Sequence, residues 1–496
     1  MVAMVIRQRS ANVNHIHLYP LLLARFTTMG KTIAYHTLGC KLNFAETSTI
    51  ARGLEKDGYE KVRFDEAADI YLINTCSVTE NADKETRTIV KRALRNSPSA
   101  KIVVTGCYAQ LKPEEIASIE GVDLVVGTND KFNLKKYFEQ LPEEKVHGEK
   151  AVFFSCDINE VNFFQSSYSL GERTRAFLKV QDGCDYSCTY CTIPLARGKS
   201  RSDSISNVVK QAEELSLAGI KEIVLTGVNI GDFGIDALKN AGSPSGDPAG
   251  TKRDENFLQL IQALDEIEGI ERFRISSIEP NLLTDEIIDF VAQSKKFMPH
   301  FHIPLQSGSD KILRGMKRRY LRDVYVSRVE KIKTAMPHCC IGMDVIVGFP
   351  RETDELFRET VDFISTLDVS YLHVFTYSER ANTEAAVMKE IVPMRIRQER
   401  NKILRQLSEK KRNHFYAQHI GDTRPVLFEM DEHDGMLEGF SDNYVKVRVP
   451  FHSSLVKNLA TVKMVGAEED YLLGEIVKGE KSMVNSEWSK VKSDTL

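Results

Sequence analysis

Three thiols lie close together in Cys184-Asp185-Tyr186-Ser187-Cys188-Thr189-Tyr190-Cys191, in the order C-x-x-x-C-x-x-C. Three thiolates can hold three irons of a 4Fe–4S cube and leave the fourth iron without a protein ligand. Such an open iron can bind a substrate or cofactor as well as carry electrons. The alternatives are buried thiols or a structural zinc loop, but zinc ribbons usually pair two C-x-x-C units, and no second pair lies nearby. The pattern therefore favours an iron–sulfur site.

This spacing resembles the signature of the radical S-adenosylmethionine (SAM) enzymes. The resemblance implies that the methionine amino and carboxylate groups of SAM occupy the open iron. An electron from the cluster would then break the sulfonium and release a 5′-deoxyadenosyl radical. Tyr190, just before the last thiol, is implied to pack beside the cluster and the SAM adenine, whereas the alternative is an ordinary core aromatic residue.

Composition limits the class of protein. The chain has 496 residues, which predicts roughly two to four domains. Its net charge of −4 gives no global argument for a nucleic-acid partner, so such an argument must rest on local patches. The nine cysteines are dispersed and odd in number, unlike a disulfide framework. No apolar stretch approaches the roughly 20 residues that span a bilayer. Oxygen-sensitive clusters need a reducing interior, so we expect a cytoplasmic protein without membrane attachment.

Residues 1–28 differ from the rest of the chain. They contain three arginines, no acidic residue and the short apolar run Leu21-Leu22-Leu23. A targeting segment is one interpretation, but the apolar run is too short for a signal peptide. We interpret residues 1–28 as a non-functional extension ahead of an initiator at Met29.

Strands and helices alternate between residues 30 and 145. The strands are expected at Ile33–Leu38, Asp69–Asn74, Lys101–Thr105 and Leu124–Val126. The helices are expected at Ala45–Lys56, Glu80–Leu94 and Pro113–Ile119. This rhythm predicts an N-terminal parallel sheet with helices on both faces.

Cys40, Cys76 and Cys107 each follow the carboxyl end of one of these strands. In an open α/β sheet those ends face one crevice, where ligands bind. Three cysteines far apart in sequence can therefore meet in space. Glycines beside Cys40 and Cys107 would let the backbone approach a bulky cluster. The alternative is three unrelated buried thiols, but their shared position favours a second three-thiol site.

A second αβ series occupies residues 170–405, after a polar connector at 141–172. Six strands are expected at Phe177–Gln181, Glu222–Thr226, Phe273–Ser276, His302–Leu305, Met343–Val347 and Leu372–Thr376. A helix over Ser204–Leu217 ends at the C-cap Gly219. Six βα units predict a partial TIM-type barrel, (βα)6, whose functional loops lie at the carboxyl ends of its strands. Residues 235–255 are expected to form a flexible surface insertion.

The C-terminal region begins with a basic helix at 395–414. A charge run is usually a solvated face, and contact with phosphate is the alternative. Within residues 418–482, short strands are expected at Pro425–Glu429, Tyr444–Val449, Leu459–Val465 and Tyr471–Val477. They predict a small β-barrel of OB-like size, a common carrier of RNA binding. We expect residues 483–496 to be disordered.

Together these motifs resemble the methylthiotransferase family, which joins a three-cysteine domain, a radical SAM barrel and a C-terminal TRAM domain. The likeness covers about residues 30–480. Thr37–Asn43, Asn74–Thr79, Val104–Gln110 and Arg318-Arg319-Tyr320 resemble the MtaB-type branch, which adds a methylthio group to C2 of N6-threonylcarbamoyladenosine beside the tRNA anticodon. Sister branches act on isopentenyladenosine in tRNA or on a ribosomal-protein aspartate. A different class, a non-catalytic iron–sulfur RNA-binding protein, also stays open.

The resemblance implies two 4Fe–4S clusters and SAM as cofactors. Cys184, Cys188 and Cys191 would hold the SAM cluster, and Cys40, Cys76 and Cys107 a second cluster that carries the sulfur. Further cofactor-binding positions are implied at Tyr190, Thr226, Gly227, Asn229, Ser276, Ser277, Glu279, Gln306, Asp344, Gly348 and Arg380; the alternative is ordinary loop-end residues. The implied partners are the tRNA anticodon stem-loop and a flavodoxin- or ferredoxin-like electron donor, and we expect a monomer.

Overall fold

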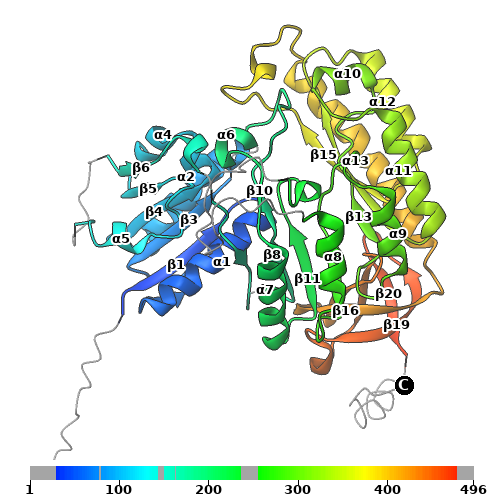
Figure 1. The fold of residues 1–496 in the computed structure, drawn as a ribbon, viewed down its shortest axis with the longest axis horizontal. Coiled ribbons are helices and arrows are strands. Elements are labelled where there is room, and N and C mark those ends of the chain that lie inside the picture. The colour runs from blue at the N-terminus through cyan, green and yellow to red at the C-terminus, as the bar shows by residue number, and fades with distance from the viewer. Residues whose placement is uncertain are drawn as a thin grey trace, which may run out of the picture.

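The computed structural model describes residues 30–76, 80–142, 150–161, 163–171, 173–235 and 255–477. An N-terminal sheet domain, a central barrel and a small C-terminal barrel follow one another along the chain (Figure 1). The predictions for residues 1–28, for most of the 235–255 insertion and for 483–496 lie outside the described residues.

The N-terminal sheet is parallel, with strand order β2-β1-β3-β4-β5-β6. Its strands are β1 (Thr32–Thr37), β2 (Glu60–Val62), β3 (Ile70–Thr75), β4 (Lys101–Gly106), β5 (Leu124–Val126) and β6 (Val152–Phe154). Its helices are α1 (Lys41–Lys56), α2 (Glu80–Asn96), α3 (Cys107–Leu111), α4 (Pro113–Ala117) and α5 (Lys135–Phe138). A separate hydrophobic cluster covers each face of the sheet. Strands buried on both faces are apolar throughout, which is why the parallel sheet was predictable.

Two short strands of this sheet were not predicted. β2 and β6 each have three residues, and Val152 and Phe153 of β6 are exposed, so neither strand has a periodic apolar pattern. β6 pairs with β5, so the sheet extends beyond residue 145, where we expected the domain to end. The expected connector at 141–172 also holds β7 (Ser167–Tyr168), which joins the barrel sheet antiparallel to its first strand.

The predicted partial barrel is confirmed. Its parallel strands are β8 (Arg175–Lys179), β11 (Glu222–Thr226), β12 (Arg272–Ile275), β13 (His300–His302), β14 (Cys340–Val347) and β15 (Tyr371–Thr376). Single bridges, such as that between Ser277 and His302, join β12 to β13. The covering helices include α7 (Ile205–Leu217), α8 (Phe257–Asp265), α9 (Asp285–Gln293), α10 (Asp310–Gly315), α11 (Arg322–Ala335) and α12 (Asp354–Thr366).

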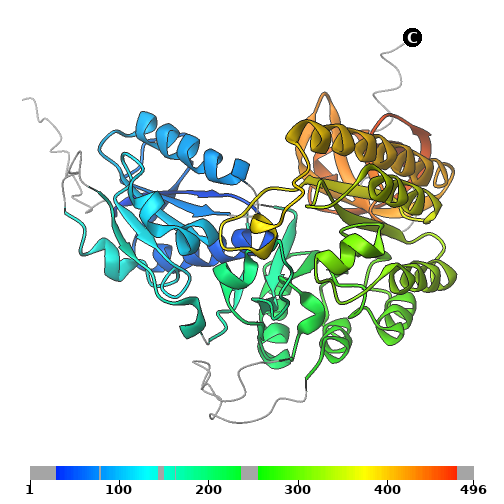
Figure 2. The same ribbon diagram turned by 90° about the horizontal axis from the view of Figure 1, so that it is seen from above.

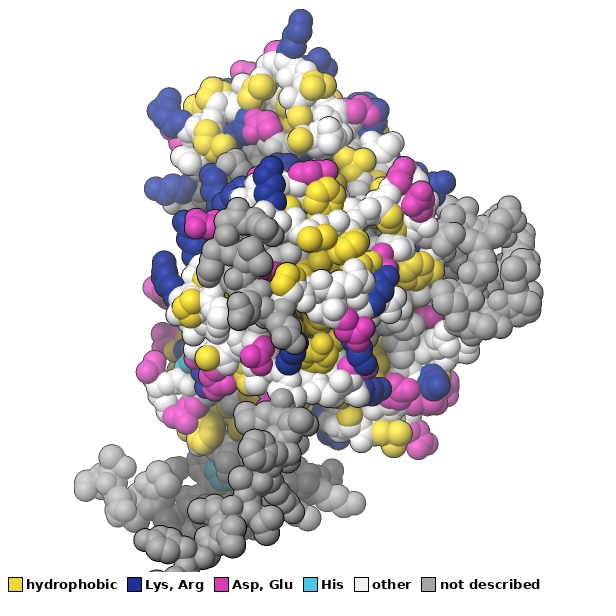
Figure 3. All heavy atoms as spheres, turned by 90° about the vertical axis from the view of Figure 1, so that its left-hand side faces the viewer, with side chains coloured by type: hydrophobic (Ala, Val, Ile, Leu, Met, Phe, Trp, Pro, Cys, Tyr) yellow, Lys and Arg dark blue, Asp and Glu magenta, His cyan; other side chains and the backbone are white. Residues whose placement is uncertain are grey.

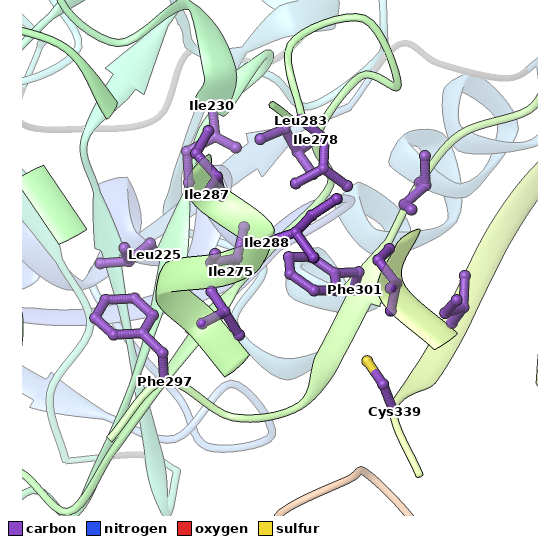
Figure 4. Close-up of a cluster of buried hydrophobic side chains, with 14 of the residues drawn as sticks. Leu225, Ile230, Ile275, Ile278, Leu283, Ile287, Ile288, Phe297, Phe301 and Cys339 are labelled. Carbon is purple, nitrogen blue, oxygen red and sulfur yellow. The ribbon is translucent and has the colours of Figure 1, made fainter. Parts of the chain in front are cut away.

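The two sides of the barrel strands differ in chemistry. Successive side chains of a strand point to opposite faces, and one set packs against the outer helices. This core includes Leu225, Ile275, Phe297 and Phe301, which gather in Figure 4. The opposite set, which faces inward, is rich in polar groups: Arg175, Glu222, Arg272, Arg274, His300, His302, Asp344 and His373. The interior of a closed TIM barrel is filled mainly by branched apolar residues, so this polar interior differs from that of a closed barrel.

The C-terminal strands form a closed barrel in the order β16-β17-β18-β20-β19, as predicted for a small β-barrel. They are β16 (Thr423–His433), β17 (Met436–Ser441), β18 (Lys446–Pro450), β19 (Leu459–Ala467) and β20 (Leu472–Ile476). We did not predict β17, because Gly439 interrupts its apolar pattern. The preceding helix, α13 (Met394–Ala417), packs against β15 and runs unbroken past residue 405, where we expected the barrel domain to end.

Arginines of β12 connect the two barrels. Arg274 donates to the carbonyls of Asp442 and Ser441, at 2.8 and 2.7 Å, and Arg272 donates to those of Phe440 and Pro425, at 3.0 and 2.7 Å. Glu222 lies 2.8 Å from Nε of Arg274. The small barrel is therefore fixed to the amino ends of the central strands, away from the cysteine loop.

Candidate active site

The loop with Cys184, Cys188 and Cys191 follows β8, at the carboxyl end of the first barrel strand. A short antiparallel pair, β9 (Gln181–Asp182) and β10 (Arg201–Ser202), closes the base of this loop. Gly183 has φ +73°, and a Cβ there would lie 2.0 Å from the carbonyl oxygen of Lys199. The two arms of the loop therefore approach so closely that only glycine fits between them.

The sulfur atoms of this loop accept hydrogen bonds that suit thiolates. The backbone N–H groups of Tyr186 and Ile193 donate to Sγ of Cys184 and Cys191, at 3.4 and 3.5 Å. Nη1 of Arg318 donates to Sγ of Cys188, at 3.1 Å. Burial raises the pKa of Cys184 to about 12 and that of Cys191 to about 11. The free thiols are therefore protonated, and metal binding would release their protons.

The second set of cysteines lies at the carboxyl ends of β1, β3 and β4. Cys40 precedes α1, Cys76 follows β3 and Cys107 begins α3. A Cβ on Gly39 would lie 2.7 Å from Sγ of Cys76, so the Cys40 loop touches the Cys76 loop. Burial raises the pKa of Cys107, whereas the positive charge of Arg197 lowers it.

These two groups of thiols have the ligand chemistry of 4Fe–4S clusters with an open iron. In the described part of the chain, no three His, Cys, Asp or Glu side chains already have metal-binding geometry. Soft thiolate donors, three to a group, fit iron–sulfur clusters better than a hard cation.

Arg318 connects the cysteine loop to the barrel interior. Besides Sγ of Cys188, its guanidinium contacts Oη of Tyr190, at 3.3 Å, and forms an ion pair with Glu279. The sequence analysis used Arg318 only as part of a family motif, and nothing in that motif showed a contact with a thiol of the cysteine loop. The segment with η3 (Glu384–Val387) lies at the same end of the barrel, because N of Ala385 donates to the carbonyl of Thr189, at 2.8 Å (Figure 2).

Gln181 organises the turn that follows β11. Its Oε1 accepts from the backbone N–H groups of Val228 and Asn229, each at 2.9 Å. A Cβ on Gly227 would lie 2.9 Å from the same oxygen. Thr226 donates to the carbonyl of Leu178, at 3.2 Å. Thr226, Gly227 and Asn229 thus lie together at the expected strand end, and Gln181 is a positioning residue that we did not predict.

The remaining predicted residues lie at the ends of β12 to β15. Oγ of Ser277 lies 2.8 Å from Nδ1 of His302, whose Nε2 lies 3.2 Å from Oδ1 of Asp344. Gln306 has a positive φ of 67° and donates its N–H to the carbonyl of Asp344, at 2.8 Å. Ser276 donates its N–H to the carbonyl of Leu225, and the Arg380 side chain is buried.

Gly348 has a structural reason for being glycine. Its φ is +78°, and a Cβ there would lie 2.3 Å from Cγ of Arg397.

Two arginines of the basic helix form ion pairs: Arg397 pairs with Glu379, and Arg400 pairs with Glu352, at 2.7 Å. Both arginines are buried, so a phosphate-contacting role for these two members of the basic helix is wrong. A charge run in sequence does not show which face of the helix is buried.

A network of buried ion pairs joins the N-terminal domain to the barrel. Glu46 of α1 is 0% exposed and accepts from Arg197, Lys131 and Lys179, at 3.0, 2.8 and 3.2 Å. Burial would raise the pKa of Glu46, but these three cations outweigh burial and hold the pKa far below its usual range. Glu46 is therefore ionised, and its three cationic partners come from both domains.

Asp182 is the second carboxylate of this network. It pairs with Arg197, Arg201 and Lys179, at 2.9, 3.1 and 3.4 Å. Nη2 of Arg197 also donates to Oδ1 of Asn43, at 2.6 Å. Four cations therefore surround two carboxylates, and the network carries excess positive charge.

A contact between two short helices also joins the N-terminal domain to the barrel. α6 (Ile193–Arg197), which follows the cysteine loop, contacts α3, which begins with Cys107. Oγ1 of Thr128 donates to the carbonyl of Ala196, at 3.0 Å. The segment that follows the cysteine loop is thus packed against the N-terminal domain beside the helix that begins with Cys107.

Comparison with known proteins agrees with this architecture. Residues 32–127 match the family described as Uncharacterized protein family UPF0004, and residues 178–364 match the Radical SAM superfamily. Threonylcarbamoyladenosine tRNA methylthiotransferase MtaB of Bacillus subtilis is 40% identical, over 90% of this chain and 96% of that protein. Its counterpart in Aquifex aeolicus is 39% identical, over 84% of this chain and 96% of that protein. A tRNA-2-methylthio-N(6)-dimethylallyladenosine synthase of Ruegeria is 32% identical, over 90% of this chain and 99% of that protein.

A barrel with a three-cysteine loop, preceded by an N-terminal domain with three further cysteines, defines a radical SAM enzyme. The chain belongs to the radical SAM methylthiotransferase family. SAM and iron–sulfur clusters are accordingly its cofactors. In the part of the chain that the structure describes, no helix is both long and apolar enough to cross a membrane.

The buried network generates a stability prediction. Arg197→Ala leaves Glu46 and Asp182 short of a buried partner, and breaking a buried ion pair costs about 3–5 kcal/mol. We expect a clearly lower midpoint in thermal unfolding of the cluster-free protein. Arg63→Ala is the matched control, because the Arg63–Asp65 pair is exposed, and it should leave the midpoint unchanged. Equal midpoints for both variants would contradict a structural role for the network.

Proposed function

We propose that this chain adds a methylthio group to C2 of N6-threonylcarbamoyladenosine beside the anticodon of tRNA. The observation that carries the proposal is the pair of three-cysteine sites, contributed by two domains and joined by one buried network. The chain is 40% identical to the threonylcarbamoyladenosine enzyme of Bacillus subtilis and 32% identical to the dimethylallyladenosine enzyme of Ruegeria, which supports this substrate. The sister activities and a non-catalytic iron–sulfur RNA-binding protein are the alternatives that experiment must exclude.

The residue roles follow from position. Cys184, Cys188 and Cys191 would hold the cluster that binds SAM. Cys40, Cys76 and Cys107 would hold the cluster that carries sulfur. When bound, these cofactors supply the radical and the sulfur that an unactivated adenine C–H bond requires.

The protein side chains orient these groups. Arg318 donates to Cys188 and pairs with Glu279, so it holds one ligand thiolate against the barrel. Gln181 fixes the turn after β11. The polar barrel interior would receive the target base, and that base must leave its stack to enter.

The partners belong to the same proposal. The tRNA anticodon stem-loop is the substrate, a flavodoxin- or ferredoxin-like protein donates electrons, and the enzyme acts as a cytoplasmic monomer. The visible face of the N-terminal domain mixes acidic and basic side chains (Figure 3), which offers no argument for RNA binding there. The small C-terminal barrel has the size of known RNA-binding modules.

The substrate is tested by nucleoside mass spectrometry of tRNA. A strain without this gene should lose 2-methylthio-N6-threonylcarbamoyladenosine and accumulate the unmethylthiolated nucleoside. The wild-type gene should restore the modification, whereas the Cys184→Ala gene should not. Loss of the methylthio group from isopentenyladenosine instead would assign the chain to the sister branch.

The division of labour between the two cysteine sites is tested in vitro. Reduced protein, reconstituted without oxygen, should cleave SAM to 5′-deoxyadenosine. Cys184→Ala should abolish this product, because it removes a ligand of the SAM-binding cluster. Cys76→Ala should keep SAM cleavage and lose sulfur insertion. A wild-type protein that cleaves no SAM would favour the non-catalytic alternative.

A further inference from the structure

A cavity of about 670 Å³, here called the edge pocket, opens at the edge of the N-terminal sheet beside β1 and α1 (Figure 1). It adjoins the last residues of β1 and β2, and the carboxyl ends of parallel strands are where open α/β sheets bind ligands. Its volume is within the usual range of ligand sites, about 300–1,000 Å³. Side chains that line it include Tyr35, His36, Phe44, Lys61, Arg63 and Phe64.

The aromatic side chains of the edge pocket are half-buried, so each leaves part of its ring open. The rings of His36 and Phe64 lie 4.9 Å apart, and Cζ of Arg92 lies 5.5 Å from the centre of the Phe64 ring. Oη of Tyr35 is buried and has no hydrogen-bond partner among the described residues. Open ring faces stack with nucleobases of any sequence, and a ligand with polar edges would satisfy the Tyr35 hydroxyl.

Two exposed cations line the same pocket. Nζ of Lys61 lies 6.0 Å from the centre of the Tyr35 ring. Arg63 pairs with Asp65, but both side chains of this pair are largely exposed, and exposed ion pairs contribute little to stability. A phosphate could therefore compete for the Arg63 guanidinium, which binds phosphate oxygens in a bidentate manner.

Phe44 connects the edge pocket to the central barrel. Its ring lies 6.4 Å from that of Phe177 on β8, and Cζ of the exposed Arg173 lies 4.4 Å from the centre of the Phe44 ring. Thr37, which also lines the pocket, precedes Cys40 by three residues. A ligand in the edge pocket would thus lie next to the first barrel strand and to the segment that carries Cys40.

We propose that the edge pocket binds an unpaired nucleotide of the tRNA anticodon loop, other than the modified adenosine. The inference rests on the proposed function. Single-stranded nucleic acid is bound by aromatic rings that stack with bases and by a basic groove that follows the phosphates. Charges of both signs cover the visible face of the domain (Figure 3), whereas the edge pocket combines rings and cations in one cavity. A nucleotide held there would orient the loop relative to both groups of cysteines.

The test measures binding of an anticodon stem-loop to the reconstituted enzyme. Phe64→Leu keeps apolar bulk but removes the flat ring, and it should raise the dissociation constant about tenfold, a typical effect of losing one stacked base. Phe64→Tyr keeps the ring and should keep most of the affinity. Lys31→Gln is the matched control, because Lys31 is an exposed lysine directly before β1, at the opposite end of that strand, and it should bind as wild type.

A change in the RNA separates the loss of a stacking partner from a folding defect. Stem-loops with one abasic nucleotide, placed at each loop position in turn, should include one that wild type binds about tenfold more weakly. Phe64→Leu should not weaken binding of that RNA further, because the missing base and the missing ring are partners. Lys61→Gln and Arg63→Gln should each reduce the slope of log affinity against log salt by about 0.7, the effect of one lost phosphate contact.

The outcomes also distinguish this site from the proposed function. Wild-type enzyme that neither binds nor modifies the stem-loop overturns the proposed function. Wild-type enzyme that modifies the stem-loop, while no abasic position is coupled to Phe64, overturns only the nucleotide site. Unchanged RNA binding by Phe64→Leu, together with conversion of a dimer to a monomer in light scattering, would assign the edge pocket to a second copy of the chain and would also overturn the proposal.

Discussion

The buried ion pairs around Glu46 and Arg197 are the constraint on which the site depends. The two groups of cysteines belong to different sheets, and neither sheet alone can fix the distance between them. Desolvation of several charges is costly, and mutual attraction compensates only where geometry is good and every group is paired. Because Glu46 contacts three cations and Asp182 three, one relative placement of the domains satisfies the network. Specificity of placement is the benefit that such a network offers a two-cofactor enzyme.

The two faces of each barrel strand have different roles. One side of each central strand builds an apolar core against the helices, so the opposite side is free to carry Arg, His, Asp and Glu. At the amino ends these groups attach the small barrel through Arg272 and Arg274. At the carboxyl ends they include His302 and Asp344, which lie 3.2 Å apart. One alternating pattern thus serves both assembly and chemistry.

The features that local sequence patterns encode were predictable. The six βα units and the strand-end positions of Cys40, Cys76 and Cys107 follow from periodicity and from the way parallel strands converge. The partners of Arg197 were not predictable, because Glu46 is 151 residues away and charge alone does not select a partner. β2 and β6 were too short for a periodic signal. The burial of Arg397 and Arg400 depends on tertiary packing of α13, which a run of basic letters does not reveal.

The count of clusters on the purified chain tests the central claim most directly. Iron and sulfide analysis with Mössbauer spectroscopy, after anaerobic reconstitution, should give two 4Fe–4S clusters per wild-type chain. Replacement of Cys40, Cys76 and Cys107 by alanine should leave one cluster, and so should replacement of Cys184, Cys188 and Cys191. A wild-type chain that holds a single cluster, lost with either set of cysteines, would contradict the account.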